Sequence, residues 1–130
     1  MPSVAHAIDE VVLVEDDGSV RRAIERILRG SGYHVATFES AEALQVVLDG
    51  ATLGDACRCL VCDVRLPGMS GFELHRRLSE HGSMPPCIFI TAHDDPSVRR
   101  QAERAGAAYL MKPFGGRALL ALVAQAVGTE

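Results

Sequence analysis

Hydrophobic residues in this chain fall into two alternating patterns, which are short apolar runs and longer stretches with apolar positions at helical spacing. The short runs are nearly continuous, which is typical of strands that are buried on both faces of a parallel sheet. Five such runs are present, namely Val11–Val14, Tyr33–Phe38, Cys59–Cys62, Cys87–Ile90 and Ala108–Met111. We predict that each of them is a strand.

A stripe of apolar residues with the helical period follows each run. The stripes are Val20, Ile24, Ile27 and Leu28; Leu44, Val47 and Leu48; Phe72, Leu74 and Leu78; Val98, Ala102 and Ala105; and Leu119, Leu122, Val123 and Ala126. The third stripe is the weakest. Five strand–helix repeats predict an α/β fold in which a five-stranded parallel sheet carries five helices on its two faces.

Residues at the ends of these segments agree with the predicted boundaries. Ser40 is placed to cap the second helix, and Asp95 with the proline after it is a favourable start for the fourth. Gly32 and Gly106 stand between a helix and the next strand, where a left-handed residue often ends a helix. We interpret residues 49–55 as a loop.

The length and charge of the chain limit what it does. Its 130 residues fit one domain, residues 1–130, with a core from about residue 9 to 127. Seventeen acidic against 13 basic residues give a net charge of -4, which argues against direct binding of nucleic acid. No apolar run approaches the roughly 20 residues that span a membrane, and the first residues do not resemble a signal peptide. We therefore expect a cytoplasmic protein without a membrane partner.

Two of the four cysteines, Cys59 and Cys62, have the spacing of a metal-binding pair. A zinc site needs a second pair of ligands at matching spacing, and none is evident. On a strand, these two side chains also point to opposite faces. We interpret the cysteines as small buried thiols in a reducing compartment.

Polar residues stand where four of the predicted strands end. They are Glu15, Asp16 and Asp17 after the first strand, Asp63 after the third, Thr91 after the fourth and Lys112 after the fifth. Ligands of an open parallel sheet bind beyond the carboxyl ends of its strands, so these residues meet on one rim. Taken singly, each of them has an interpretation without function: the acids after the first strand as a solvated loop, Asp63 as a turn residue, Thr91 as a strand-end hydroxyl and Lys112 as a surface lysine. Their convergence favours a functional site.

Clustered carboxylates repel one another unless a cation lies between them, and oxygen ligands favour Mg²⁺. A metal, a lysine and a hydroxyl together bind a phosphoryl group. Asp63 is then free to attack phosphorus and form an aspartyl phosphate, while Asp16 holds the metal and Glu15 assists. Asp17 has two readings, as a further metal ligand or as the N-cap of the first helix.

Four segments that contain these residues resemble the signature segments of response-regulator receiver domains of two-component systems. The segments are Val12–Asp17, Cys62–Gly71, Ile90–His93 and Lys112–Phe114. The resemblance covers roughly residues 9 to 127, and the details of these segments are similar to receivers of FixJ-type transcription regulators. It implies the doubly wound, flavodoxin-like fold called CheY-like, with strand order 2-1-3-4-5.

The resemblance implies a role for each matching residue. Asp63 accepts a phosphoryl group from a sensor histidine kinase or a phosphotransfer protein. Asp16, Asp63 and the backbone carbonyl of Arg65 bind Mg²⁺, and Glu15 assists them. Such a domain catalyses only its own phosphorylation and dephosphorylation, so it is not an enzyme in the ordinary sense.

The resemblance also implies a switch. Thr91 and Lys112 contact the phosphoryl group, and Tyr109 on the fifth strand turns inward. The surface formed by the fourth helix, the fifth strand and the fifth helix then controls a downstream effector, and a phosphorylation-dependent homodimer is a further expectation. Family members often have a cis peptide bond at the position of Lys112–Pro113.

This sequence departs from the family pattern at several positions. Gly115 and Gly116 replace the usual capping residue of the last helix, which predicts a loosely held start. Arg65 and His93 occupy positions that tune phosphate lifetime in relatives. The sequence does not distinguish a stand-alone regulator from the receiver of a DNA-binding protein.

Two rival functions use a similar set of residues. A haloacid-dehalogenase-type phosphatase needs an acid two residues after its nucleophile, where this chain has Arg65. A degenerate, non-phosphorylated receiver that serves only as a protein-binding module usually lacks the acid, the threonine or the lysine, and here all three are present.

Overall fold

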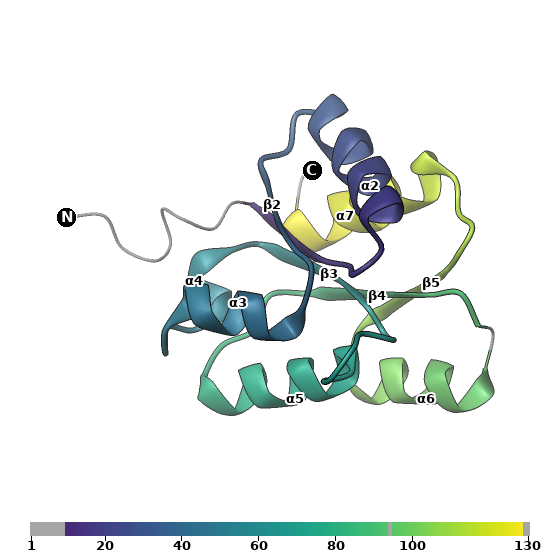
Figure 1. Ribbon diagram of the computed structural model, residues 1–130. Coiled ribbons are helices and arrows are strands. Elements are labelled where there is room, and N and C mark those ends of the chain that lie inside the picture. Colours follow the sequence, from purple (N-terminus) through teal and green to yellow (C-terminus); the bar gives the residue numbers. More distant parts are fainter. Residues whose placement is uncertain (1–9, 94, 129–130) are drawn as a thin grey trace.

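The computed structural model describes residues 10–93 and 95–128, and within them it shows a five-stranded parallel sheet between two layers of helices (Figure 1). The strands are β1 (Val11–Val14), β2 (Val35–Phe38), β3 (Cys59–Asp63), β4 (Cys87–Thr91) and β5 (Ala108–Met111). Their order in the sheet is β2-β1-β3-β4-β5, and every neighbouring pair is parallel. The predicted α/β fold and its strand order are confirmed.

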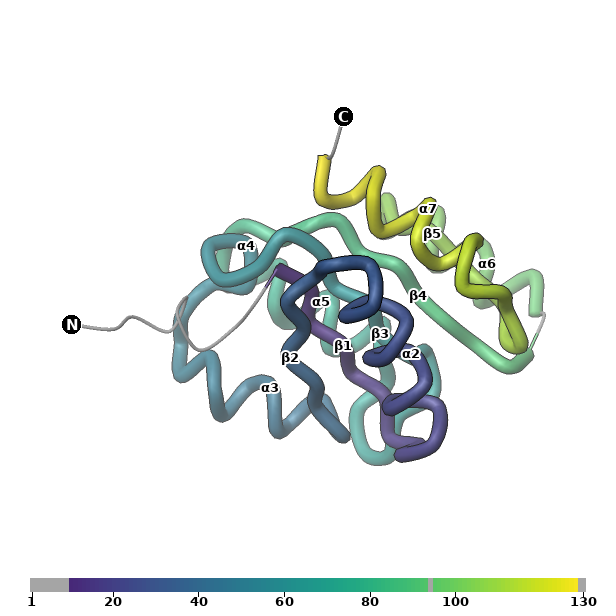
Figure 2. The backbone as a smooth tube through the Cα atoms, turned by 90° about the horizontal axis from the view of Figure 1, so that it is seen from above, coloured from purple at the N-terminus to yellow at the C-terminus, as the bar shows by residue number. Residues whose placement is uncertain are grey.

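Helices cover both faces of this sheet. They are α2 (Gly18–Gly30), α3 (Ala41–Leu48), α4 (Leu53–Ala56), α5 (Gly71–His81), α6 (Pro96–Arg104) and α7 (Gly116–Val127). Helices α2 and α7 lie together on one face, and α3, α5 and α6 lie on the other (Figures 1 and 2). None of the helices in the described part of the chain is long and apolar enough to cross a membrane.

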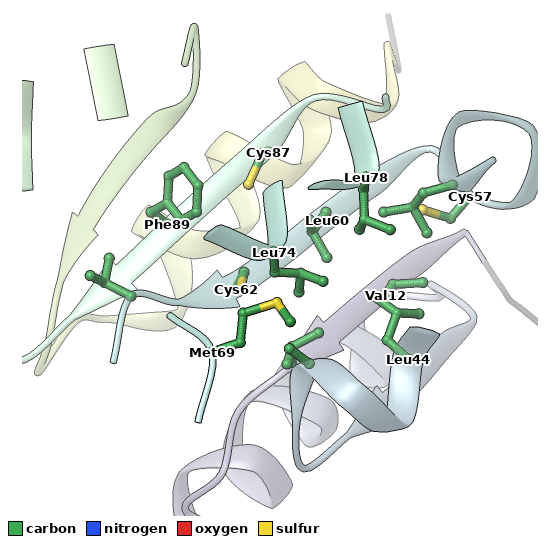
Figure 3. Close-up of a cluster of buried hydrophobic side chains, with 14 of the residues drawn as sticks. Val12, Leu44, Cys57, Leu60, Cys62, Met69, Leu74, Leu78, Cys87 and Phe89 are labelled. Carbon is green, nitrogen blue, oxygen red and sulfur yellow. The ribbon is translucent and has the colours of Figure 1, made fainter. Parts of the chain in front are cut away.

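Two hydrophobic clusters, one on each face, hold the layers together. In β1, Val11 and Leu13 pack against α2 and α7, whereas Val12 and Val14 pack into the cluster beneath α3 and α5. Figure 3 shows the second cluster, in which Phe89 of β4 lies among side chains of neighbouring elements. Strands β1, β3 and β4 are buried on both faces, which explains their nearly continuous apolar sequences.

The predicted boundary residues act as expected. The side chain of Ser40 accepts a hydrogen bond from the backbone N of Ala43, and Asp95 caps α6 directly before its proline. Gly32 and Gly106 have φ angles of +93° and +69°, a region that glycine enters without steric cost. At α7, Gly115 offers no side-chain hydrogen bond, so this helix starts without a polar cap.

One short helix was not predicted. The stretch read as a loop, residues 49–55, contains the start of α4. Leu53 is completely buried there, and the hydroxyl of Thr52 donates to Asp55 at 2.7 Å. The backbone N of Gly54 donates to Ser83 O at 2.9 Å, so a contact with a distant segment stabilises this turn.

The ends of the described chain meet at the amino-terminal side of the sheet. The backbone N of Arg58, which precedes β3, donates to Glu10 O at 2.9 Å. Its guanidinium donates to Val127 O, at the end of α7, at 2.6 Å. Arg58 therefore joins the residue before β1 to the last turn of the final helix.

The four cysteines are buried free thiols, as predicted. Cys59 belongs to the cluster beneath α2 and α7, and Cys62 belongs to the opposite cluster. Burial raises the pKa of both thiols, to about 12 for Cys59, and keeps them protonated. These thiols are therefore part of the hydrophobic core.

Candidate functional site

The polar residues predicted to meet on one rim come together at the carboxyl ends of the strands. Glu15 follows β1, Asp63 is the last residue of β3, and Lys112 follows β5. The parallel register of β1, β3, β4 and β5 brings these ends to the same edge. Residues 49 positions apart in sequence, Asp63 and Lys112, are therefore in direct contact.

Asp63 is at the centre of this group and is only 5% exposed. Lys112 Nζ donates to its Oδ2 at 2.9 Å, and the backbone N of Arg65 donates to its Oδ1 at 3.0 Å. The carboxylate is therefore fixed by one partner from another strand and one from its own loop. A positioned carboxylate next to a lysine is suited to attack an electrophile whose negative charge the lysine stabilises.

Glu15 is fully buried, which its sequence position did not reveal. Its Oε1 lies 2.7 Å from Lys112 Nζ, and its Oε2 accepts a hydrogen bond from the backbone N of Asp17 at 3.1 Å. Burial raises the pKa of Glu15 to about 7, although Lys112 and the Asp17 amide oppose this rise. The nearby charge of Asp63 raises the pKa further.

Lys112 links the two acids. Burial acts to lower the pKa of Lys112, but hydrogen bonds and charge interactions with Glu15 and Asp63 outweigh it, and the net effect raises the pKa. The ammonium group is therefore charged at neutral pH. The peptide bond between Lys112 and Pro113 is cis, as the family resemblance implied.

Three carboxylates of this rim are grouped closely enough to hold one metal ion. One oxygen from each of Glu15, Asp16 and Asp63 lies within 4.8 Å of the others. Asp16 is exposed to solvent, so an ion has access from outside. A site made of oxygen atoms with more acids than lysines fits a hard divalent cation such as Mg²⁺.

Asp17, the third acid of its segment, has a different position. Its Oδ1 accepts hydrogen bonds from the backbone N of Ser19 at 2.9 Å and of Val20 at 3.1 Å. These are the bonds of a helix N-cap, so Asp17 caps α2. Of the two readings that the sequence left open, the structure supports capping.

Gly71, the first residue of α5, allows this helix to pack closely against the end of β3. Its backbone N donates to Val64 O at 2.9 Å. A Cβ atom at this position would collide with the backbone O of Asp63 and would come within 3.1 Å of Cys62 Sγ. The sequence analysis did not single out Gly71, since its importance depends on a contact between separate elements.

Thr91 and Tyr109 are connected through the backbone of His93. The hydroxyl oxygen of Thr91 accepts a hydrogen bond from the backbone N of His93 at 3.2 Å, and the phenol of Tyr109 donates to His93 O at 3.2 Å. The guanidinium of Arg99 lies over the Tyr109 ring, 5.6 Å from its centroid. The loop after β4 is therefore bonded to both residues of the predicted switch.

Comparisons with known proteins agree with this geometry. The family model described as the response regulator receiver domain matches residues 11–124. The chain is 42% identical over 118 residues to Nodulation protein W of Bradyrhizobium diazoefficiens, covering 89% of this chain and 50% of that protein. It is 32% identical over 118 residues to the transcriptional regulatory protein FixJ of the same bacterium, covering 90% and 56%.

A solved structure, a response regulator receiver protein from Burkholderia phymatum, matches with a TM-score of 0.79 and 45% identity, covering 92% of this chain and 95% of the other. The chain spans about half the length of the curated relatives it matches. The agreement in both sequence and fold establishes that this chain belongs to the response regulator receiver domain family of two-component systems.

Proposed function

We propose that Asp63 accepts a phosphoryl group from a phosphohistidine of a sensor histidine kinase or a phosphotransfer protein, with Mg²⁺ as cofactor. The observation that carries the proposal is the position of the Asp63 carboxylate. It lies 2.9 Å from the charged Lys112 and within the group of three acids that fits a divalent ion. Glu15, Asp16, Asp63 and the backbone carbonyl of Arg65 would hold this ion.

The transfer exchanges one bond to phosphorus for another. A carboxylate oxygen of Asp63 attacks phosphorus, the P–N bond to the donor imidazole breaks, and the imidazole leaves with the bond's electron pair and takes up a proton. Bound Mg²⁺ supplies positive charge to the phosphoryl oxygens. Lys112, now held by Glu15 and Asp63, is placed to pair with the new phosphoryl group.

The charges of the site support a requirement for the cation. Glu15 and Asp63 share one lysine, and Asp16 adds a third acid at the surface. Burial is the main cause of the raised pKa of Glu15, and the nearby charge of Asp63 adds to it. A divalent ion held by these carboxylates would offset this repulsion.

Phosphorylation would then move the loop after β4. The phosphoryl group brings about -1.5 to -2 charges and strong acceptor oxygens, and the Thr91 hydroxyl is the donor on the neighbouring strand. When Thr91 turns toward those oxygens, its bond with His93 is lost, and His93 also accepts from Tyr109. The result is a change in the surface formed by α6, β5 and α7, which we assign as the output surface.

A cavity beside the site is suited to the phosphate donor. It has a volume of about 230 Å³ and lies between α2 and the segment after β5, where Ile24, Ile27 and Phe114 line it together with Lys112. Apolar side chains from a helix of the donor would fill this cavity while the phosphohistidine reaches Asp63. On the output side, the partner would be a downstream effector domain or protein, and phosphorylation would promote homodimers.

The test is the intact mass of the protein after incubation with acetyl phosphate and Mg²⁺. We expect a gain of one phosphoryl group in the wild type and none in Asp63→Asn. Asp16→Ala should lose the Mg²⁺-dependent gain, whereas Asp17→Ala, which removes the same charge one residue away, should keep it. No gain in the wild type with acetyl phosphate or with a phosphorylated kinase would refute the proposal and favour a non-phosphorylated binding module.

A further inference from the structure

A groove between α5 and α6, which the proposed function does not use, is the strongest further candidate for a binding site. It has a volume of about 510 Å³ and is lined by Phe72, His75, Arg76, Ser79, Gln101, Arg104 and Ala105. It lies on the face of the sheet opposite α2 and α7 (Figure 1), and residues of both α5 and α6 line it. It is separate from the cavity next to Lys112.

The floor of the groove is aromatic and well supported. The ring of Phe72 lies 4.5 Å from that of the fully buried Phe89, centroid to centroid, and His75 meets Phe89 edge-on at 5.7 Å. Burial lowers the pKa of His75, which adds to the uncharged character of this floor. Such a surface accepts an apolar side chain, since aromatic faces contribute a large contact area.

The rim of the groove is basic. Two charged side chains line the groove, Arg76 from α5 and Arg104 from α6, and both are positive although the whole chain carries a net charge of -4. Arg104 forms no ion pair with any residue of the described ranges, 10–93 and 95–128. Arg76 on the α5 side lies 3.1 Å from Glu80 but is 61% exposed, so it also remains accessible to an anionic partner.

The open shape of the groove favours a protein partner over a small molecule. Small ligands usually occupy pockets that cover most of their surface, and this groove is open to solvent rather than enclosed. A peptide segment can bind to an open groove by placing one or two side chains in it while the peptide backbone stays outside. The combination of apolar floor and basic rim determines the chemistry of that segment.

We infer that the α5–α6 groove binds an acidic segment of a partner protein, with an apolar anchor residue over Phe72 and carboxylates beside Arg104 and Arg76. Phe89, which supports the floor, is the register partner of Tyr109 in β5, and both belong to one hydrophobic cluster. A side chain bound over Phe72 would therefore be connected to Tyr109, the residue assigned to the switch, through the packing of Phe89. The docking itself does not depend on phosphorylation of Asp63.

The test uses the full 130-residue chain as bait for a displayed library of random peptides, followed by titration of the ¹⁵N-labelled chain with the enriched peptides. We expect peptides in which Asp or Glu flank a Phe or Leu, and amide shifts that concentrate on α5 and α6. Arg104→Glu should weaken binding by roughly fivefold or more, because it replaces an exposed attraction with a repulsion. The matched variant Arg26→Glu, an exposed arginine on the opposite layer, should bind as the wild type does.

A second variant tests the floor without changing the charge. Ser79→Trp places a bulky ring into the groove from an exposed helical position, and it should abolish binding while the circular dichroism spectrum and thermal midpoint stay close to those of the wild type. Failure to enrich acidic peptides, or peptides that bind Arg104→Glu and Ser79→Trp as well as the wild type, would overturn the inference. Phosphorylation measured by mass in the same samples separates this outcome from a failure of the proposed function.

Discussion

Replacement of Gly71 by alanine tests how the site is held together. In an ordinary helix this change stabilises a protein by about 0.5–1 kcal/mol, because alanine loses less backbone entropy on folding than glycine. At Gly71 the new Cβ would collide with the backbone O of Asp63 and would lie 3.1 Å from Cys62 Sγ. The Asp63 O atom belongs to the backbone and cannot rotate away, so the start of α5 must move away from β3.

Overpacking of this kind costs about 1–3 kcal/mol, against a gain in helix propensity of about 0.5–1 kcal/mol, which leaves a net loss of about 0.5–2 kcal/mol. For a domain of this size, we expect the midpoint of thermal unfolding to fall by roughly 2–7 °C. Since the collision is with the residue that carries the carboxylate, the rate of phosphorylation by acetyl phosphate should fall as well.

Gly116→Ala is the matched control, because Gly116 is also the first residue of a helix. Its added Cβ would meet only Ile27, at an ordinary contact distance of 3.5 Å. We expect an unchanged or slightly higher stability for this variant, by up to about 0.5–1 kcal/mol. Urea unfolding followed by circular dichroism measures the free energy of unfolding of both variants. A Gly71→Ala protein as stable as the wild type, with the control behaving as stated, would refute the claim that α5 and β3 are in unavoidable contact here.

The remaining predictions concern single polar groups. Asp17→Ala should lower the free energy of unfolding by about 1 kcal/mol through loss of the N-cap, as measured with urea. In metal-free protein, the pKa of Glu15 is about 7 when folded against 4.5 ordinarily, so its stabilisation is complete below about pH 4.5 and is lost as pH rises through 7. The free energy of unfolding should fall by at most about 3 kcal/mol over this pH range. Glu15→Gln should remove this dependence on pH, as measured by the urea midpoint at each pH. Tyr109→Phe deletes the bond to His93 O, so it should cost about 1 kcal/mol or less, with NMR shifts centred on the loop after β4.

Much of the fold was predictable because the local patterns and the tertiary structure agree. The continuous apolar sequence of Val11–Val14 exists because β1 is central in the sheet, and the strand ends placed Asp63 and Lys112 on one rim. Periodicity and strand-end chemistry were therefore sufficient for these features. The family resemblance supplied the cis bond before Pro113, which the apolar pattern does not encode.

Other features depend on contacts that no local pattern encodes. Helix α4 was missed because it is stabilised by the burial of Leu53 and a bond to a distant segment. The complete burial of Glu15 and its direct pairing with Lys112 depend on residues that are distant in the sequence. The three-residue link from Thr91 through His93 to Tyr109 likewise requires the loop after β4 to fold over the edge strand.

The bonds made by Arg58 have a consequence for how this domain is joined to other chains. They bring Glu10 and Val127 to the same side of the sheet, whereas the carboxylates lie at the opposite ends of strands that rise about 3.3 Å per residue. A short linker could therefore close the chain into a circular permutant, with new termini at the exposed turn at Asp49 and Gly50. The same arrangement would let the domain be inserted into a host protein, with the edge that carries the carboxylates directed away from the point of attachment.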